Sequence, residues 1–188
     1  MCIRDRSENS SAIAAQQAWN LAGHLESLET QTGTQIRIVL AESCTAGLVA
    51  ALLGQVPGIS RFLCGAMVTY RESAKQQWLS VSPESLERFT AESLETTRSM
   101  ASSVLARTTE ATFSAAITGH LGPLTGDDQT SEKDGRTFVV VAKRENDSTT
   151  IVSSDTIQLR SGTRIDRQYE SSAAVLRALS NAVASYSN

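Results

Sequence analysis

IRIVLAESCTAGLVA, residues 36–50, joins an apolar, β-branched run to a cluster of small and hydroxyl residues. The run at 36–40 predicts a buried strand, and the apolar spacing that begins at Leu48 predicts a helix. A strand that leads directly into a helix aims free backbone N–H groups at one place in space. Ser43 lies at that junction, where a nucleophile, an anion and an oxyanion could share one site.

Helical and strand patterns alternate on both sides of this junction. Before it, apolar residues at three- and four-residue spacing predict an amphipathic helix over 12–28, with its exit at Gly33. After it, the patterns predict strands at 62–70, 112–118, 137–142 and 150–159, and helices at 45–53, 71–79, 92–107 and 163–185, with a helical turn opening at 82–84. Strands separated by helices, with a late antiparallel hairpin, predict an α/β fold: a three-layer α/β/α domain with a mixed, mostly parallel sheet.

The length of the chain fits one domain. Its 188 residues can bury a sizeable core, and no linker, repeat or low-complexity segment interrupts them. We expect residues 12–188 to form the domain and residues 1–11 to be a disordered or non-native N-terminal segment. Residues 1–6, MCIRDR, look unrelated to the rest of the chain, and no apolar region after them suggests a signal peptide.

Composition argues against several classes of partner. The net charge is −3, and Lys and Arg are scattered, so no basic stripe predicts nucleic-acid binding. No apolar run approaches the roughly 18 residues of a membrane span, so no membrane partner is expected. The three cysteines, Cys2, Cys44 and Cys64, are odd in number and lack metal-ligand spacing. They favour a reducing cytoplasm and no metal site.

Three loops come after predicted strand ends, at 42–47, 70–75 and 118–126. Ligands of open α/β sheets bind at the carboxyl ends of strands, so these loops are expected to converge. Ser43 would need a neighbouring base to act as a nucleophile. Lys75 could supply one if its pKa fell well below the usual value of about 10.4. From residue type alone, a solvated charge is the favoured interpretation of Lys75, and Ser43 is equally a helix cap.

Other reactive residues carry weaker signals. His24 lies on the first predicted helix and is expected to be a partly exposed helix residue, whereas His120 lies in a strand-end loop with nothing nearby to orient it. Cys44 could be a thiolate at a helix N-terminus, but packing is the favoured interpretation. Asp127 and Asp128 predict a solvated turn rather than a metal site.

Several motifs occur in an informative order: AESCTAG at 41–47, GAMVTY at 65–70, AK at 74–75, AITG at 116–119, GP at 122–123, Gly135 at the hairpin entry and SGTR at 161–164. Together they resemble the C-terminal domain of the CinA (competence-damage-inducible) family, over about residues 12–186. Stand-alone members of that family are nicotinamide-nucleotide amidohydrolases, also called NMN deamidases.

This resemblance implies hydrolysis of the carboxamide of nicotinamide mononucleotide (NMN) to nicotinate mononucleotide and ammonia. By motif position, Ser43 looks like the nucleophile and Lys75 like its activating base. Tyr70 looks like a substrate-positioning or proton-relay group. No metal or organic cofactor is implied, and the family makes a homo-oligomer plausible.

The resemblance also implies a substrate-binding set. Thr118 and Gly119 fall at a motif beside the substrate, and Arg164 could pair with the nucleotide phosphate. Backbone N–H groups near the serine would stabilise the developing oxyanion. The residues expected to provide them are Thr45, Ala46 and Gly47.

Two departures from the family pattern leave alternatives open. Ala46-Gly47 stands where the family has Gly-Gly, and TGHLGPLTG at 118–126 replaces its Thr-Gly-Ile-Ala-Gly-Pro-Gly-Gly loop. Fewer glycines change backbone freedom and with it the shape of a pocket. The alternatives are an amidohydrolase for a different small amide, and a non-catalytic nucleotide-binding or assembly module of the same fold.

Overall fold

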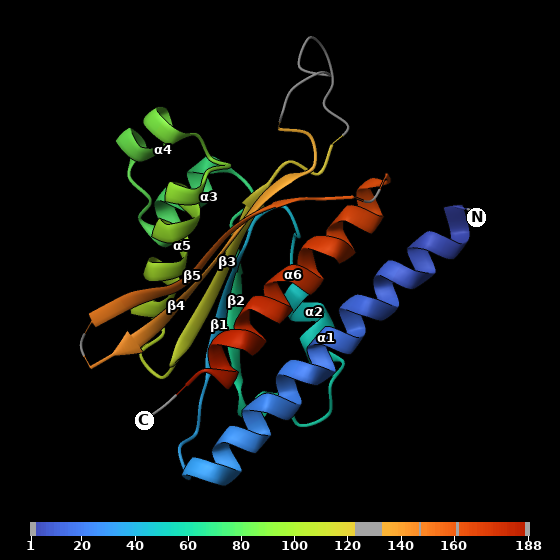
Figure 1. The fold of residues 1–188 in the computed structure, drawn as a ribbon. Coiled ribbons are helices and arrows are strands. Elements are labelled where there is room, and N and C mark those ends of the chain that lie inside the picture. Colours follow the sequence, from blue (N-terminus) through green and yellow to red (C-terminus); the bar gives the residue numbers. More distant parts are fainter. Residues whose placement is uncertain (1–2, 123–132, 147, 161, 187–188) are drawn as a thin grey trace.

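The computed structural model describes residues 3–122, 133–146, 148–160 and 162–186. Within them, a five-stranded sheet of order β2-β1-β3-β4-β5 lies between two helical layers (Figure 1). The strands are β1 (Ile38–Glu42), β2 (Leu63–Val68), β3 (Phe113–Gly119), β4 (Arg136–Glu145) and β5 (Ser148–Gln158). The helices are α1 (Ile3–Thr32), α2 (Leu48–Gly54), α3 (Glu72–Leu79), α4 (Pro83–Phe89), α5 (Leu94–Arg107) and α6 (Arg164–Ala184), with a 3-10 turn at Ile59–Arg61.

The pairing of the strands brings the predicted loops together. β1 lies between β2 and β3 and is parallel to both, so Glu42 at its end is level with Val68 and with Ile117. The carboxyl ends of these three strands therefore meet at one edge of the sheet. β3, β4 and β5 then pair antiparallel, and the last two form the predicted hairpin.

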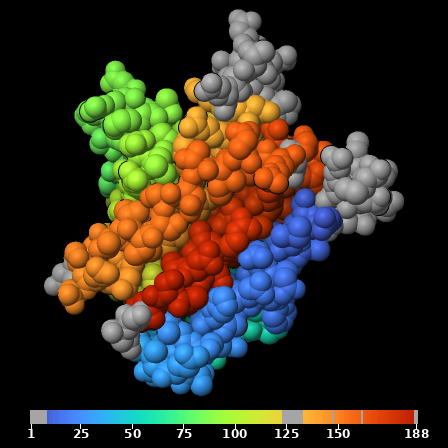
Figure 2. Space-filling model, in the orientation of Figure 1, coloured from blue at the N-terminus to red at the C-terminus, as the bar shows by residue number. Residues whose placement is uncertain are grey.

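Each face of the sheet is covered by its own group of helices. α1, α2 and α6 lie on one face, and α3, α4 and α5 lie on the other (Figure 1). In the space-filling view, α1 and α6 run side by side across the outside of the first layer (Figure 2). The first layer packs through residues such as Leu21, Leu25, Leu176 and Leu179, and the second through residues such as Met100, Val104 and Leu105.

The predicted three-layer α/β fold with a mixed sheet and a late hairpin is confirmed. The sheet has two parallel and two antiparallel pairings, so its parallel part is smaller than "mostly parallel" implies. The first helix begins at Ile3 rather than near residue 12. Strand β1 extends to Glu42, two residues past the apolar run, because Ala41 and Glu42 still pair with both β2 and β3.

Some predicted features lie outside the described residues: Asp127 and Asp128, the loop segment 123–126, and Ser161 of the SGTR motif. Among the helices of the described part, none is both long and apolar enough to cross a membrane.

Candidate active site

Ser43 is the first residue after β1, the strand that lies between β2 and β3. Its backbone N–H donates to the carbonyl oxygen of Ile117 at 3.1 Å, which continues the parallel pairing with β3 by one residue. Its side chain is buried, with 5% of the residue exposed. The serine therefore sits at the edge of the sheet on a rigid part of the backbone.

Lys75 reaches the same point from the first turn of α3. The side chain is fully buried, and Nζ lies 3.0 Å from Ser43 Oγ. Nζ also donates to the carbonyl oxygens of Thr69, at 2.8 Å, and of Tyr70, at 3.5 Å. Burial lowers the pKa of Lys75, because the buried site disfavours the charged ammonium. The negative charge of Glu92 acts in the opposite direction.

These contacts place the amine for proton exchange with the serine. Nζ donates to Ser43 Oγ as well as to the two carbonyls; once the amine is neutral, two N–H bonds can keep the carbonyls of Thr69 and Tyr70 while the lone pair accepts from the Ser43 hydroxyl. A general base must lie about 2.6–3.2 Å from the group whose proton it takes, and the Nζ–Oγ separation meets that requirement. The predicted pairing of Ser43 with Lys75 is therefore present as a direct hydrogen bond.

Glu42 holds the turn that carries the serine. Its carboxylate is 1% exposed and faces the start of α2. Oε2 accepts hydrogen bonds from the Thr45 hydroxyl at 2.7 Å and from the N–H groups of Gly47 at 2.9 Å and Val49 at 3.2 Å. Oε1 accepts from the N–H of Ala50 at 2.9 Å. A buried carboxylate with four donors fixes residues 43–50 as one unit.

Replacing Glu42 with glutamine should destabilise the protein. In either orientation, the amide NH₂ would face a backbone N–H that now donates to a carboxylate oxygen. We expect the free energy of unfolding in urea to fall by about 2–4 kcal/mol, because buried donors lose their acceptor. Glu26→Gln, an exposed site on α1, is the matched control. A loss for Glu42→Gln that equals the control's would contradict this role.

The expected oxyanion donors are only partly available. The N–H of Gly47 donates to Glu42, and the N–H of Ala46 donates to the carbonyl oxygen of Ser43 at 3.0 Å. Among the described residues, neither Cys44 nor Thr45 donates its N–H to another backbone carbonyl, and the N–H of Cys44 lies against the sulfur of its own side chain. The N–H groups of Ala46 and Gly47 thus close the turn in this structure, which leaves those of Cys44 and Thr45 as the candidate oxyanion donors.

The Ala-Gly sequence at this turn has a backbone consequence. Ala46 has φ 54° and Gly47 has φ 96°, both in the left-handed region that favours glycine. An alanine there costs about 1–2 kcal/mol of backbone strain. The glycine that the resemblance would place at position 46 therefore matches the conformation that this turn adopts.

A pocket of about 180 Å³ opens above the serine. Tyr70 and Arg164 line it, and the guanidinium of Arg164 donates to the Tyr70 hydroxyl at 2.9 Å. Gly119 also lines the pocket.

Thr118 lies behind the wall of this pocket, since it is fully buried and its hydroxyl bonds to that of Thr97 at 2.8 Å. The pocket thus gathers Ser43, Tyr70, Gly119 and Arg164, while Thr118 supports it from below.

Glu92 and His120 form a further wall that sequence reasoning did not assign. His120 Nε2 lies 3.5 Å from Glu92 Oε2, and both residues line the pocket. The sequence around His120 offers no partner to orient its ring, and Glu92 is that partner in the folded chain. Glu92 is a single acidic residue just before the cap of α5, and nothing in the sequence around it indicates that it lines a pocket.

The other residues weighed from the sequence have structural roles. Cys44 is buried, and burial raises the pKa of its thiol to about 12, so the thiolate needed for attack is scarce at neutral pH. His24 lies on α1 and bonds through Nδ1 to the hydroxyl of Ser180 on α6 at 2.6 Å. Among the described residues, no group of three or more His, Cys, Asp or Glu side chains is placed to hold a metal ion.

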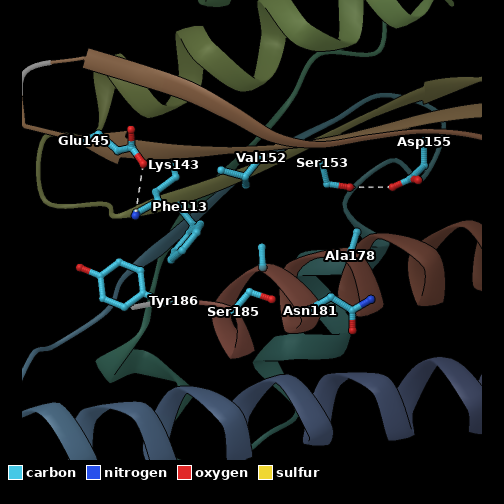
Figure 3. Close-up of a pocket in the computed structure, with 11 residues that line it drawn as sticks. Phe113, Lys143, Glu145, Val152, Ser153, Asp155, Ala178, Asn181, Ser185 and Tyr186 are labelled. Carbon is cyan, nitrogen blue, oxygen red and sulfur yellow. Dashed lines mark hydrogen bonds and ion pairs between the residues drawn. The ribbon is translucent and has the colours of Figure 1, made fainter. Parts of the chain in front are cut away.

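A second hollow of about 410 Å³ lies at the opposite end of the sheet (Figure 3). Four of its polar side chains form two pairs: Lys143 with Glu145 at 3.3 Å, and the Ser153 hydroxyl with Asp155 at 2.7 Å. Lys143 also lies 4.7 Å from the centre of the Tyr186 ring. Its charged groups are thus paired within the hollow. The hollow lies at the start of β3, and Ser43 lies beside the other end of that strand.

Comparison with known proteins bears on the whole fold. The CinA C-terminal domain family model matches residues 21–183. A CinA-like protein of Myxococcus xanthus is 41% identical over 96 residues, which are 51% of this chain and 23% of that protein. Protein YdeJ of Escherichia coli is 41% identical over 96 residues, which are 51% of this chain and 55% of that protein. The chain thus matches less than two thirds of the length of either relative.

Solved structures agree. A competence or damage-inducible protein from Enterobacter asburiae superposes with a TM-score of 0.75 at 30% identity, covering 90% of this chain and 98% of that chain. Competence damage-inducible protein A from Klebsiella pneumoniae gives a TM-score of 0.78 at 25% identity, covering 93% and 99%. With the matched family model, these likenesses establish that the chain belongs to the CinA C-terminal domain family.

Proposed function

We propose that this protein hydrolyses the carboxamide of nicotinamide mononucleotide to nicotinate mononucleotide and ammonia. The observation that carries the proposal is the 3.0 Å contact between the buried amine of Lys75 and the hydroxyl of Ser43, at the floor of a pocket. A lysine with a lowered pKa beside a serine is a nucleophile–base pair suited to amide hydrolysis.

The acylation step starts from these positions. Ser43 Oγ attacks the carboxamide carbon while Lys75 Nζ takes the hydroxyl proton. The carbonyl oxygen becomes an oxyanion, and the backbone N–H groups of Cys44 and Thr45, which donate to no backbone carbonyl of the described residues, are its donors; the residue after a nucleophile commonly serves in this way. The C–N bond then breaks, and the Lys75 ammonium gives its proton to the departing nitrogen, which leaves as ammonia.

The deacylation step reuses the same base. Water attacks the ester on Ser43 and gives a proton to Lys75. The ester bond breaks, nicotinate mononucleotide leaves, and Lys75 returns the proton to Ser43 Oγ. Because burial lowers the pKa of Lys75, a larger fraction of this amine is neutral near neutral pH, and so available to take a proton, than of a solvated lysine.

Arg164 is placed to bind the phosphate of the nucleotide. It lines the pocket, is exposed at the start of α6, and bonds to the Tyr70 hydroxyl at 2.9 Å. A guanidinium held beside a hydroxyl offers several donors to a phosphate group. Tyr70 then positions the arginine and the substrate together, which supports its proposed positioning role.

A different small amide is the second candidate substrate. The observation that favours it is the lining of the pocket by His120 and Leu121, at the loop where the sequence departs from the family pattern. These residues form the wall of the pocket that follows β3. The hydrolytic residues would be the same, and only the bound amide would differ.

The experiment is an assay of purified protein with NMN, in which ammonia and nicotinate mononucleotide are both quantified. We expect one ammonia for each nicotinate mononucleotide formed. Nicotinamide, glutamine and asparagine, tested in parallel, separate the two candidate substrates. Ammonia from one of these amides and none from NMN would favour the second candidate. Calorimetric binding of NMN without ammonia release would instead indicate a non-catalytic binding module.

A further inference from the structure

Two opposite charges reach the pocket from opposite faces of the sheet. Arg164 begins α6, which packs on the face covered by α1 and α2, whereas Glu92 lies just before α5, on the face covered by α3 and α4. Both residues line the pocket above Ser43. The cavity therefore has a cationic side and an anionic side, with the reactive serine at its floor.

We propose that Glu92 is a specificity-determining residue, which makes this pocket select an amide whose ring carries a positive charge. This inference rests on the proposed function. NMN has such a charge distribution, since its pyridinium ring is cationic and its phosphate is anionic. With the phosphate at Arg164, the ring would lie where the carboxylate of Glu92 attracts it.

Glu92 is held in this position by His120. The two side chains lie 3.5 Å apart, and the side chain of Glu92 is 30% exposed while that of His120 is 27% exposed. A carboxylate in this partly enclosed position is screened less than one on the open surface. Its charge also reaches the floor of the pocket, because it raises the pKa of Lys75 against the effect of burial.

A neutral wall would bind charged and uncharged rings alike. The distinction is testable because reduced NMN keeps the phosphate, the ribose and the carboxamide but has an uncharged dihydropyridine ring. Attraction by Glu92 should therefore strengthen the binding of NMN and leave the binding of reduced NMN unaffected. A purely structural Glu92–His120 pair would affect both nucleotides equally.

The experiment compares Glu92→Gln with Glu87→Gln, which removes the same charge from an exposed site on α4. For NMN, kcat and KM are measured; for reduced NMN, KM is measured if it is hydrolysed, and the competitive inhibition constant otherwise. We expect Glu92→Gln to raise the KM for NMN about tenfold, with kcat within about threefold, and to leave the constant for reduced NMN within about twofold. Glu87→Gln should change neither constant, and Glu92→Asp, which keeps the charge, should retain the preference for NMN.

Equal changes for both nucleotides, or no change for either, would overturn the inference, as would a Glu92→Asp protein without preference for NMN. Failure of the proposed function has a separate signature, which is a wild-type protein that releases no ammonia from NMN. In that case, calorimetric dissociation constants of NMN and reduced NMN test the charge selection instead. We expect Glu92→Gln to raise the dissociation constant of NMN about tenfold and to leave that of reduced NMN within about twofold.

Discussion

Replacing Lys75 with methionine should lower kcat/KM for NMN hydrolysis by about a thousandfold or more. Methionine has a similar length and fills the buried site, but it cannot take the proton of Ser43, whose Oγ lies 3.0 Å from Nζ. It also cannot protonate the departing ammonia, and each proton transfer contributes about 10²–10⁴ to a rate. Ammonia release measured over time gives the value directly.

Lys143→Met is the matched control for this variant. Lys143 lies at the opposite end of the sheet, where it pairs with Glu145, so its loss should leave hydrolysis unchanged. A Lys75→Met protein that is folded by circular dichroism and as active as Lys143→Met would show that Lys75 is not the base.

The same variant should change how stability depends on pH. Burial lowers the pKa of Lys75 in the folded protein, while the unfolded chain keeps a value of about 10.4. Between these two values the unfolded chain binds the extra proton, so the stability of the wild type relative to Lys75→Met should rise with pH. The slope is at most about 1.4 kcal/mol per pH unit, and below both values the difference should be constant. Urea unfolding of both proteins from about pH 6 to about pH 10 measures it, and a difference that falls as pH rises would contradict the direction of the pKa change.

The junction that decides the fold was predictable because its pattern is local. The apolar run of β1 and the spacing after Leu48 specify a strand and a helix without reference to other residues. The convergence of three loops was expected from the general rule for parallel strands. The 3.0 Å contact of Ser43 with Lys75, which are 32 residues apart, needed the motif resemblance as well, since residue type alone left both as ordinary surface or cap residues.

Other features depend on tertiary packing and had no local signal. Glu42 follows an apolar run, but only the folded turn shows that its carboxylate binds the start of α2. The backbone donors of Ala46 and Gly47 were predicted to serve the oxyanion, yet the turn itself uses them. Glu92 and His120 lie far apart in the sequence, and their contact exists because α5 and β3 pack together.

The central claim is that Ser43 is the nucleophile of an amide hydrolysis, and Ser43→Ala tests it most directly. Ammonia release from NMN is measured for the wild type, for Ser43→Ala and for Ser27→Ala, which alters an exposed serine on α1. Because no other hydroxyl lies at Lys75 Nζ among its described contacts, Ser43→Ala should lose about a thousandfold or more of kcat, while Ser27→Ala keeps the wild-type rate. Undiminished ammonia release by a folded Ser43→Ala protein would contradict the account.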